Sequence, residues 1–89
     1  MKSLAIYLDE LKDCENLKND SEVAKKLKVT RSYVSQVRSG SYMSDEKCFQ
    51  LSLLIKREPI ELLSLNRSIR EGNKEVSKYW LKVHKNNKG

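Results

Sequence analysis

NDSEVAKKLKVTRSYVSQVRSG, residues 19–40, decides the fold expected for this chain. Its apolar residues recur at the spacing of two short amphipathic helices, and the first pattern stops shortly before Thr30. Thr30 offers a hydroxyl as the N-cap of the second helix, and Gly40 supplies a left-handed stop at its end. We therefore predict helices over residues 20–28 and 31–39, joined by a tight turn. Their inward faces are formed by Val23, Ala24, Leu27, Val34 and Val37.

The ends of the first helix carry their own local signals. Asn19, followed three residues later by Glu22, is typical of a capping box. Ala24 is small, which allows the second helix to cross closely, and Val29 in the turn is expected to plug the space between the two helices. These signals agree in order and spacing, although a pair of short helices also occurs in ordinary small helical bundles.

The second predicted helix keeps a polar face free for a partner. This face contains no carboxylate, and its side chains can donate hydrogen bonds to base edges and phosphates in a major groove. The residues of this face are Arg31, Ser32, Ser35, Gln36 and Arg38.

The pair resembles the helix-turn-helix of the Cro and lambda-repressor-like (Cro/CI) family, with VTRSYVSQVRSG, residues 29–40, as the recognition-helix segment. The resemblance implies an all-α, lambda-repressor-like five-helix domain over residues 1–71. That family usually has a glycine where this chain has Lys28. Lys28 is therefore expected to take a left-handed conformation that is costly for lysine, or the turn differs slightly.

The resemblance also implies which residues contact DNA. The predicted base-reading residues are Arg31, Ser32 and Gln36. The predicted phosphate contacts lie on both motif helices and in the segment that follows the second one. They are Lys26, Thr30, Ser35, Arg38, Ser41, Tyr42 and Ser44. Tyr42 is equally consistent with a packing role.

Three further helices are expected around the motif. The first spans residues 3–15 with an apolar stripe that Cys14 widens, and its outer face is acidic. Ser44 is a good N-cap for the fourth helix, which should end near Arg57, and Pro59 should open a fifth helix that ends near Glu71. The stripe of the first helix consists of Leu4, Tyr7, Leu8, Leu11 and Cys14.

Residues 72–89 form an additional segment. Val76, Tyr79, Trp80 and Val83 recur at helical spacing and predict an extra amphipathic helix with an aromatic stripe. This helix either closes the monomer core or forms a dimer interface, and we favour a dimer interface made by these four residues. The polar and basic tail, residues 84–89, is expected to fray.

Composition narrows the class of protein. The 89 residues carry a net charge of +6, and residues 21–40 contain five Lys or Arg against one Asp or Glu, which suits an anionic partner. The single histidine, His84, falls in the expected tail, and the carboxylates are expected on solvated helix faces, so no catalytic group and no cofactor is predicted. Cys14 and Cys48 form no zinc pattern and are expected to be buried reduced thiols in a cytoplasmic protein.

The working hypothesis is a sequence-specific regulator of transcription that binds double-stranded DNA. One recognition helix covers few base pairs, so a homodimer on an inverted-repeat operator is expected, as for a small repressor of a phage or other mobile element. The alternative is an antitoxin that binds a toxin through its C-terminal helix and regulates its own operon. No membrane and no small-molecule substrate is expected as a partner.

Overall fold

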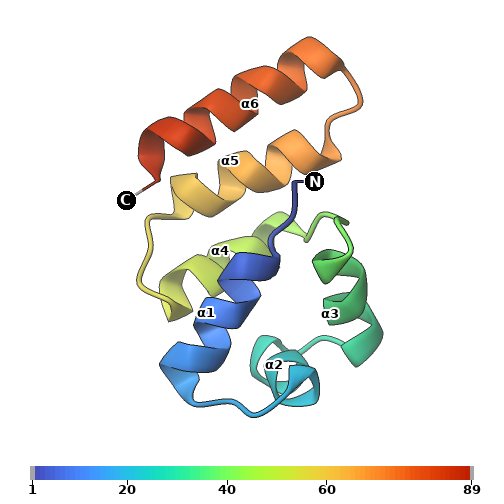
Figure 1. Ribbon diagram of the computed structural model, residues 1–89, viewed down its shortest axis with the longest axis vertical. Coiled ribbons are helices and arrows are strands. Elements are labelled where there is room, and N and C mark those ends of the chain that lie inside the picture. Colours follow the sequence, from blue (N-terminus) through green and yellow to red (C-terminus); the bar gives the residue numbers. More distant parts are fainter. Residues whose placement is uncertain (1, 89) are drawn as a thin grey trace.

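The computed structural model describes residues 2–88, and this range contains six α-helices and no strand (Figure 1). The all-α class expected from the sequence is therefore confirmed. In Figure 1, α5 and α6 lie side by side at one end of the molecule, while α2 and α3 lie at the other. The helices are α1 (Ala5–Glu15), α2 (Asp20–Leu27), α3 (Arg31–Arg38), α4 (Asp45–Leu54), α5 (Pro59–Arg70) and α6 (Lys74–Asn87).

The five helices α1, α2, α3, α4 and α5 share one apolar core. The stripe of α1 packs against the inward faces of the other helices, and most of these side chains are fully buried. Leu17 and Val29, which lie in the connections on either side of α2, are partly buried against the same core, and for Val29 the sequence predicts an inward position. The buried residues are Leu4, Tyr7, Leu8, Leu11, Val23, Ala24, Leu27, Val34, Val37, Met43, Cys48, Leu51, Ile55, Leu62 and Leu65.

The start and end of α2 follow from local signals. The Asn19 side chain accepts a hydrogen bond from the Glu22 amide at 3.1 Å, and the Glu22 carboxylate accepts one from the Lys18 amide at 2.9 Å. The capping box is thus displaced by one residue, because its carboxylate reaches Lys18 instead of Asn19. Lys28 adopts the left-handed conformation (φ 59°), so the first of the two expected turn geometries is confirmed.

The loop after α3 is held by a buried amide. Gly40 has a positive φ of 110°, which confirms its expected role as a stop. Met43 is buried, and Asn66 of α5 brackets its backbone: the Met43 amide donates to Asn66 Oδ1 at 2.7 Å, and Asn66 Nδ2 donates to the Met43 carbonyl at 2.8 Å. The path of this loop is therefore set by α5, a helix distant in sequence.

The helices α4 and α5 begin where the sequence predicts, at the Ser44 cap and at Pro59. The end of α4 differs, since the helix stops at Leu54 instead of near Arg57. Lys56 takes a left-handed conformation (φ 59°), and the Arg57 amide donates to the Ser52 carbonyl at 2.9 Å, which closes the helix end.

Helix α6 extends further than expected and packs along α5. The expectation that residues 84–89 fray is wrong for 84–87, which are helical; Gly89 lies outside the described residues. His84 is buried, and its Nδ1 lies 2.7 Å from the Glu61 carbonyl oxygen. The seam also buries Ser68 and Ser77, whose hydroxyls lie 3.0 Å apart. The face that packs on α5 thus includes the buried polar residues Ser77 and His84 beside the partly buried Leu81, and apolar periodicity alone does not reveal the polar part.

The two cysteines have different environments. Cys48 is buried, and this burial raises the pKa of its thiol to about 12. Cys14 is exposed, so the expectation that both thiols are buried is wrong for Cys14. It lies in the last turn of α1, which extends past the core. Among residues 2–88, no helix combines the length and apolar character needed to cross a membrane.

Candidate nucleic-acid interface

Helix α3 lies at the edge of the molecule (Figure 1), and most of its polar side chains are exposed. Val34 and Val37 anchor it to the core, and the Thr30 hydroxyl caps it by accepting from the Tyr33 amide at 3.0 Å. Both anchors keep α3 rigid without using the outward side chains. The α3 outer face, defined as Arg31, Ser32, Ser35 and Gln36, is exposed over its whole length.

The three predicted base-reading residues share this face. Arg31, Ser32 and Gln36 are exposed, and their side chains make no hydrogen bond or ion pair within the part of the chain that the structure describes. Their donors are therefore available to a partner. A helix of about 10–12 Å diameter fits the major groove of B-DNA, where arginine and glutamine can read base edges.

Arg38, predicted as a phosphate contact, is held inside the protein. Its guanidinium binds both carboxylate oxygens of Asp20 at 2.9 Å and lies 2.8 Å from Asp9. The hydrogen bond from Arg38 holds the pKa of Asp20 below its usual value, and the same bond raises the pKa of Arg38. Arg38 therefore fastens α3 to α2 and α1, and the contacts to Asp20 and Asp9 already engage Nε and both terminal nitrogens of its guanidinium.

We expect Asp20→Asn to lower the free energy of unfolding by about 1 kcal/mol at neutral pH, because a charged, partly exposed pair is lost. The pKa of Asp20 is lower in the folded state, so this stabilisation is complete above the unfolded-state pKa and disappears as the pH falls through the folded-state pKa. Urea unfolding near pH 7 and near pH 3 measures the difference. Asp9→Asn, which keeps the bidentate pair, serves as the control; equal losses for the two variants, or a loss independent of pH, would contradict the assignment.

Lys26 and Ser44 are also engaged, though less firmly. Lys26 forms an ion pair with Glu15 at 2.9 Å on the surface, where a phosphate can compete for the ammonium. The Ser44 hydroxyl caps α4 by accepting from the Lys47 amide, while the Ser44 amide donates to the Tyr33 hydroxyl at 3.0 Å. Ser44 is therefore placed beside α3 with its backbone donor already used.

The loop after α3 presents the remaining predicted contacts. Ser41 and Tyr42 are exposed, and Tyr42 has 53% of its surface accessible, which contradicts the packing alternative for this side chain. Sequence reasoning missed Tyr33 and Asn66, which hold the loop from α3 and α5. A tyrosine inside a polar helix was the available signal for Tyr33; nothing local indicates Asn66.

The charge pattern around α3 favours an anion. Lys25, Lys28 and Arg31 are exposed, and none of them forms an ion pair within residues 2–88. Two acidic residues of α2, Asp20 and Glu22, are used by Arg38 and by the α2 cap. The unpaired charge on this side is thus positive, as a phosphate backbone requires.

The predicted dimer stripe of α6 is divided between solvent and the neighbouring helix. Tyr79 is 61% exposed and Val76 is also exposed, whereas Trp80 and Val83 are half-buried. Trp80 lies under the Arg67 guanidinium, 5.3 Å from ring centroid to Cζ, and Tyr79 meets it edge to face at 5.4 Å. Helix α6 therefore packs on its own chain partly through Trp80 and Val83 and leaves Val76 and Tyr79 accessible.

One carboxylate is not on a solvated face, contrary to expectation. Glu61 is only 2% exposed, accepts a hydrogen bond from the Tyr7 hydroxyl at 2.6 Å and pairs with Arg57 at 3.0 Å. Burial and the bond to Glu61 raise the pKa of Tyr7 above its ordinary value. This cluster lies in the core and connects helices; among residues 2–88, no three His, Cys, Asp or Glu side chains are grouped as metal ligands.

Comparisons with protein-family models, with curated proteins and with solved structures gave no match to this chain. What bears on the class of protein is therefore the exposure and the charge of the surface around α3. Helix α3 has exposed hydrogen-bond donors with no partner within residues 2–88, and the adjoining α2 and its C-cap carry the exposed Lys25 and Lys28. Exposed donors beside positive charge are features by which nucleic-acid-binding surfaces are sought.

Proposed function

We propose that this chain is a sequence-specific regulator of transcription that binds double-stranded DNA. In this proposal residues 1–71 form a lambda-repressor-like domain, with α2 and α3 as its helix-turn-helix. The α3 outer face is the observation that supports the proposal. Its hydrogen-bond donors are exposed and have no partner within residues 2–88, and the opposite side of α3 is packed on the core. Its lack of a carboxylate also removes repulsion from phosphates.

In the proposed complex α3 lies in the major groove. Arg31 can donate two hydrogen bonds to a guanine, Gln36 can bind an adenine at two positions, and Ser32 can reach either type of base. Contacts to phosphates would come from the flanks of α3 and set the position of the protein without reading sequence. The candidates are Lys26, Thr30, Ser35, Ser41, Tyr42 and Ser44; Arg38 is omitted because Asp20 and Asp9 hold it.

One recognition helix covers only a few base pairs, so specific binding to an operator requires two copies of α3. A twofold homodimer would place the two α3 helices in successive major grooves, about 34 Å apart, on an inverted-repeat operator. Occupancy of the operator would depend mainly on protein concentration, as in a small repressor of a phage or other mobile element.

The direct test is selection of bound sequences from a pool of random duplexes, followed by anisotropy titration of the enriched sequence at two salt concentrations. We expect enrichment of a palindrome, with binding that weakens as salt increases. Salt-dependent binding without any enriched sequence would contradict a sequence-specific regulator. Binding to a single, asymmetric half-site would contradict the proposed dimer.

A second candidate is an antitoxin that uses the same α3 on DNA and binds a toxin through α6. The accessible Tyr79 and Val76 favour it, since exposed aromatic side chains are common anchors in protein interfaces. The two candidate functions predict different oligomeric states for the purified chain. A stable homodimer favours the repressor, whereas a monomer with an accessible stripe favours a foreign protein partner.

A further inference from the structure

We propose that an apolar face shared by α4, α5 and α6 binds the same face of a second copy of this chain about a twofold axis. The inference specifies the dimer that the proposed function uses, and its test requires no DNA. This α4–α6 face includes the stripe of α6 but is centred on the groove between α4 and α5. Its apolar residues are Phe49, Leu53, Ile60, Leu63, Val76, Tyr79, Trp80 and Val83.

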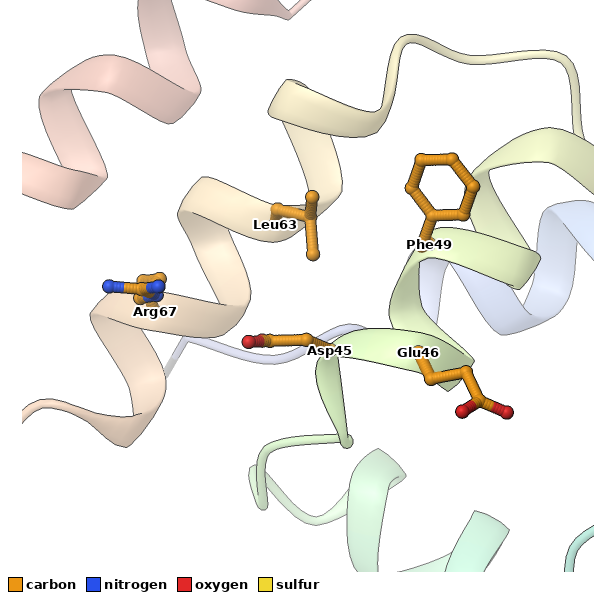
Figure 2. Close-up of a pocket in the computed structure, with 5 residues that line it drawn as sticks. All are labelled: Asp45, Glu46, Phe49, Leu63 and Arg67. Carbon is orange, nitrogen blue, oxygen red and sulfur yellow. The ribbon is translucent and has the colours of Figure 1, made fainter.

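The centre of the face is a hollow of about 320 Å³ between α4 and α5, lined by Phe49 and Leu63 and by the charged residues Asp45, Glu46 and Arg67. Figure 2 shows Phe49 on the wall formed by α4 and Leu63 on the wall formed by α5, with Arg67 further along α5. Leu53 is one helical turn after Phe49 and is 56% exposed, and Ile60 is one turn before Leu63 and is also exposed. The apolar surface thus continues past the hollow toward the α4–α5 turn.

Arg67 connects this groove to α6. It lines the hollow, and its guanidinium also covers the Trp80 ring at 5.3 Å. Tyr79 then contacts Trp80 edge to face, and Val76 lies one turn before Trp80 on the same flank of α6. The three helices therefore present one continuous surface.

The size of this surface is that of an apolar patch found at interfaces. An aromatic side chain has roughly 150–250 Å² of surface in total, and Phe49 and Tyr79 expose 46% and 61% of theirs, so the eight apolar residues together present several hundred Å². The largest apolar patch on a monomer is commonly about 300–600 Å², and a stable interface buries about 800 Å² per partner including its polar rim. In the proposed dimer, Arg67 and the ends of α4 supply part of that polar rim.

The charges at the ends of α4 indicate a second copy as the occupant. Glu46 lies in the first turn and Lys56 lies just after the last turn, about 15 Å away along the helix, and both are exposed. If two copies of α4 cross antiparallel about a twofold axis, Glu46 of each copy faces Lys56 of the other. Phe49 and Leu53 lie between these opposite charges along α4, so the exposed side of α4 is complementary to itself, as an isologous interface requires.

The interface also begins next to the proposed DNA-binding helix. Ser44, which precedes α4, is bound through its amide to Tyr33 of α3. Contacts between two copies along α4 would consequently be transmitted to the orientation of both α3 helices.

Sedimentation velocity over a range of protein concentrations tests the proposal. We expect the wild-type chain to dimerise and Leu53→Glu to raise the dimer dissociation constant about 30-fold or more, as for an apolar residue that the interface buries. Ile6→Glu is the matched control: Ile6 is 64% exposed on α1, outside the α4–α6 face, and its replacement should leave dimerisation unchanged. A monomeric wild type, or equal effects of the two variants, would overturn the proposal.

A charge exchange tests the antiparallel arrangement. Glu46→Lys and Lys56→Glu should each weaken the dimer about 3- to 10-fold, and the double variant should return to within about 2-fold of wild type because both pairs are restored with reversed signs. Circular dichroism confirms that each variant is folded. Failure of the double variant to recover would overturn the antiparallel crossing. A dimer that passes both tests while duplex selection fails would contradict the proposed function alone.

Discussion

Arg57→Ala is expected to lower the free energy of unfolding by about 3–5 kcal/mol, because it leaves Glu61 as a buried carboxylate without its cationic partner. Arg57 lies in the turn between α4 and α5 and also binds both oxygens of Glu10 on α1, at 2.6 and 2.9 Å. Tyr7 donates to the same Glu61 carboxylate, and His84 of α6 binds the Glu61 carbonyl. The variant therefore weakens contacts among α1, α5 and α6 at once.

Urea unfolding at neutral pH measures this loss. Lys26→Ala is the control, since it removes a cation from an exposed ion pair of similar length and should cost less than about 1 kcal/mol. Adding Glu61→Gln to Arg57→Ala should recover part of the stability, because a neutral amide costs less to bury than a carboxylate. An Arg57→Ala variant no less stable than Lys26→Ala would show that the buried cluster contributes little to folding.

The second large effect concerns DNA. Under the proposed function, the double variant Arg31→Ala/Gln36→Ala should lose about 2–6 kcal/mol of affinity for the selected operator, because each base-reading side chain contributes roughly 1–3 kcal/mol and the two sites are independent. Its affinity for unrelated duplexes should fall much less, since most phosphate contacts remain. Anisotropy titrations with both duplexes measure the two losses separately.

Two controls distinguish a loss of base recognition from a general loss of positive charge and from a loss of folding stability. Lys85 is exposed on α6, and Lys85→Ala removes one positive charge there, so operator affinity should change by less than about 2-fold. The double variant itself should unfold within about 0.5 kcal/mol of wild type, because both side chains are exposed. Operator binding that survives the double variant would place the reading face elsewhere. Thr30 is a poor probe, since its hydroxyl also caps α3.

The motif could be predicted from the sequence because its signals are local. Asn19 and Thr30 cap backbone amides three residues away, and Gly40 stops a helix through its own backbone freedom. The exposure of Arg31 and Gln36 follows from the helical period once the inward valines are known. These features depend on neighbours within one or two turns, so periodicity and capping chemistry are sufficient to predict them.

Other features depended on residues far apart in the chain. Arg38 matches the pattern of a free phosphate contact, yet Asp20 and Asp9, 18 and 29 residues before it, bind its guanidinium. His84 matches a fraying tail, yet it packs beside Glu61. Sequence patterns do not show which donor reaches which acceptor across the fold, because that depends on how the helices pack.

By itself the sequence determined the six helices, the α2–α3 pair and the polar outer face of α3, since each follows from periodicity and local hydrogen bonding. The tertiary structure alone decided which polar side chains remain available. In the folded chain, Arg38, Glu61 and His84 bind other residues of the same chain. Apolar residues between α4, α5 and α6 remain at the surface. The physical reason is that burial and ion pairing depend on distances between helices, which are set only when the whole core is packed.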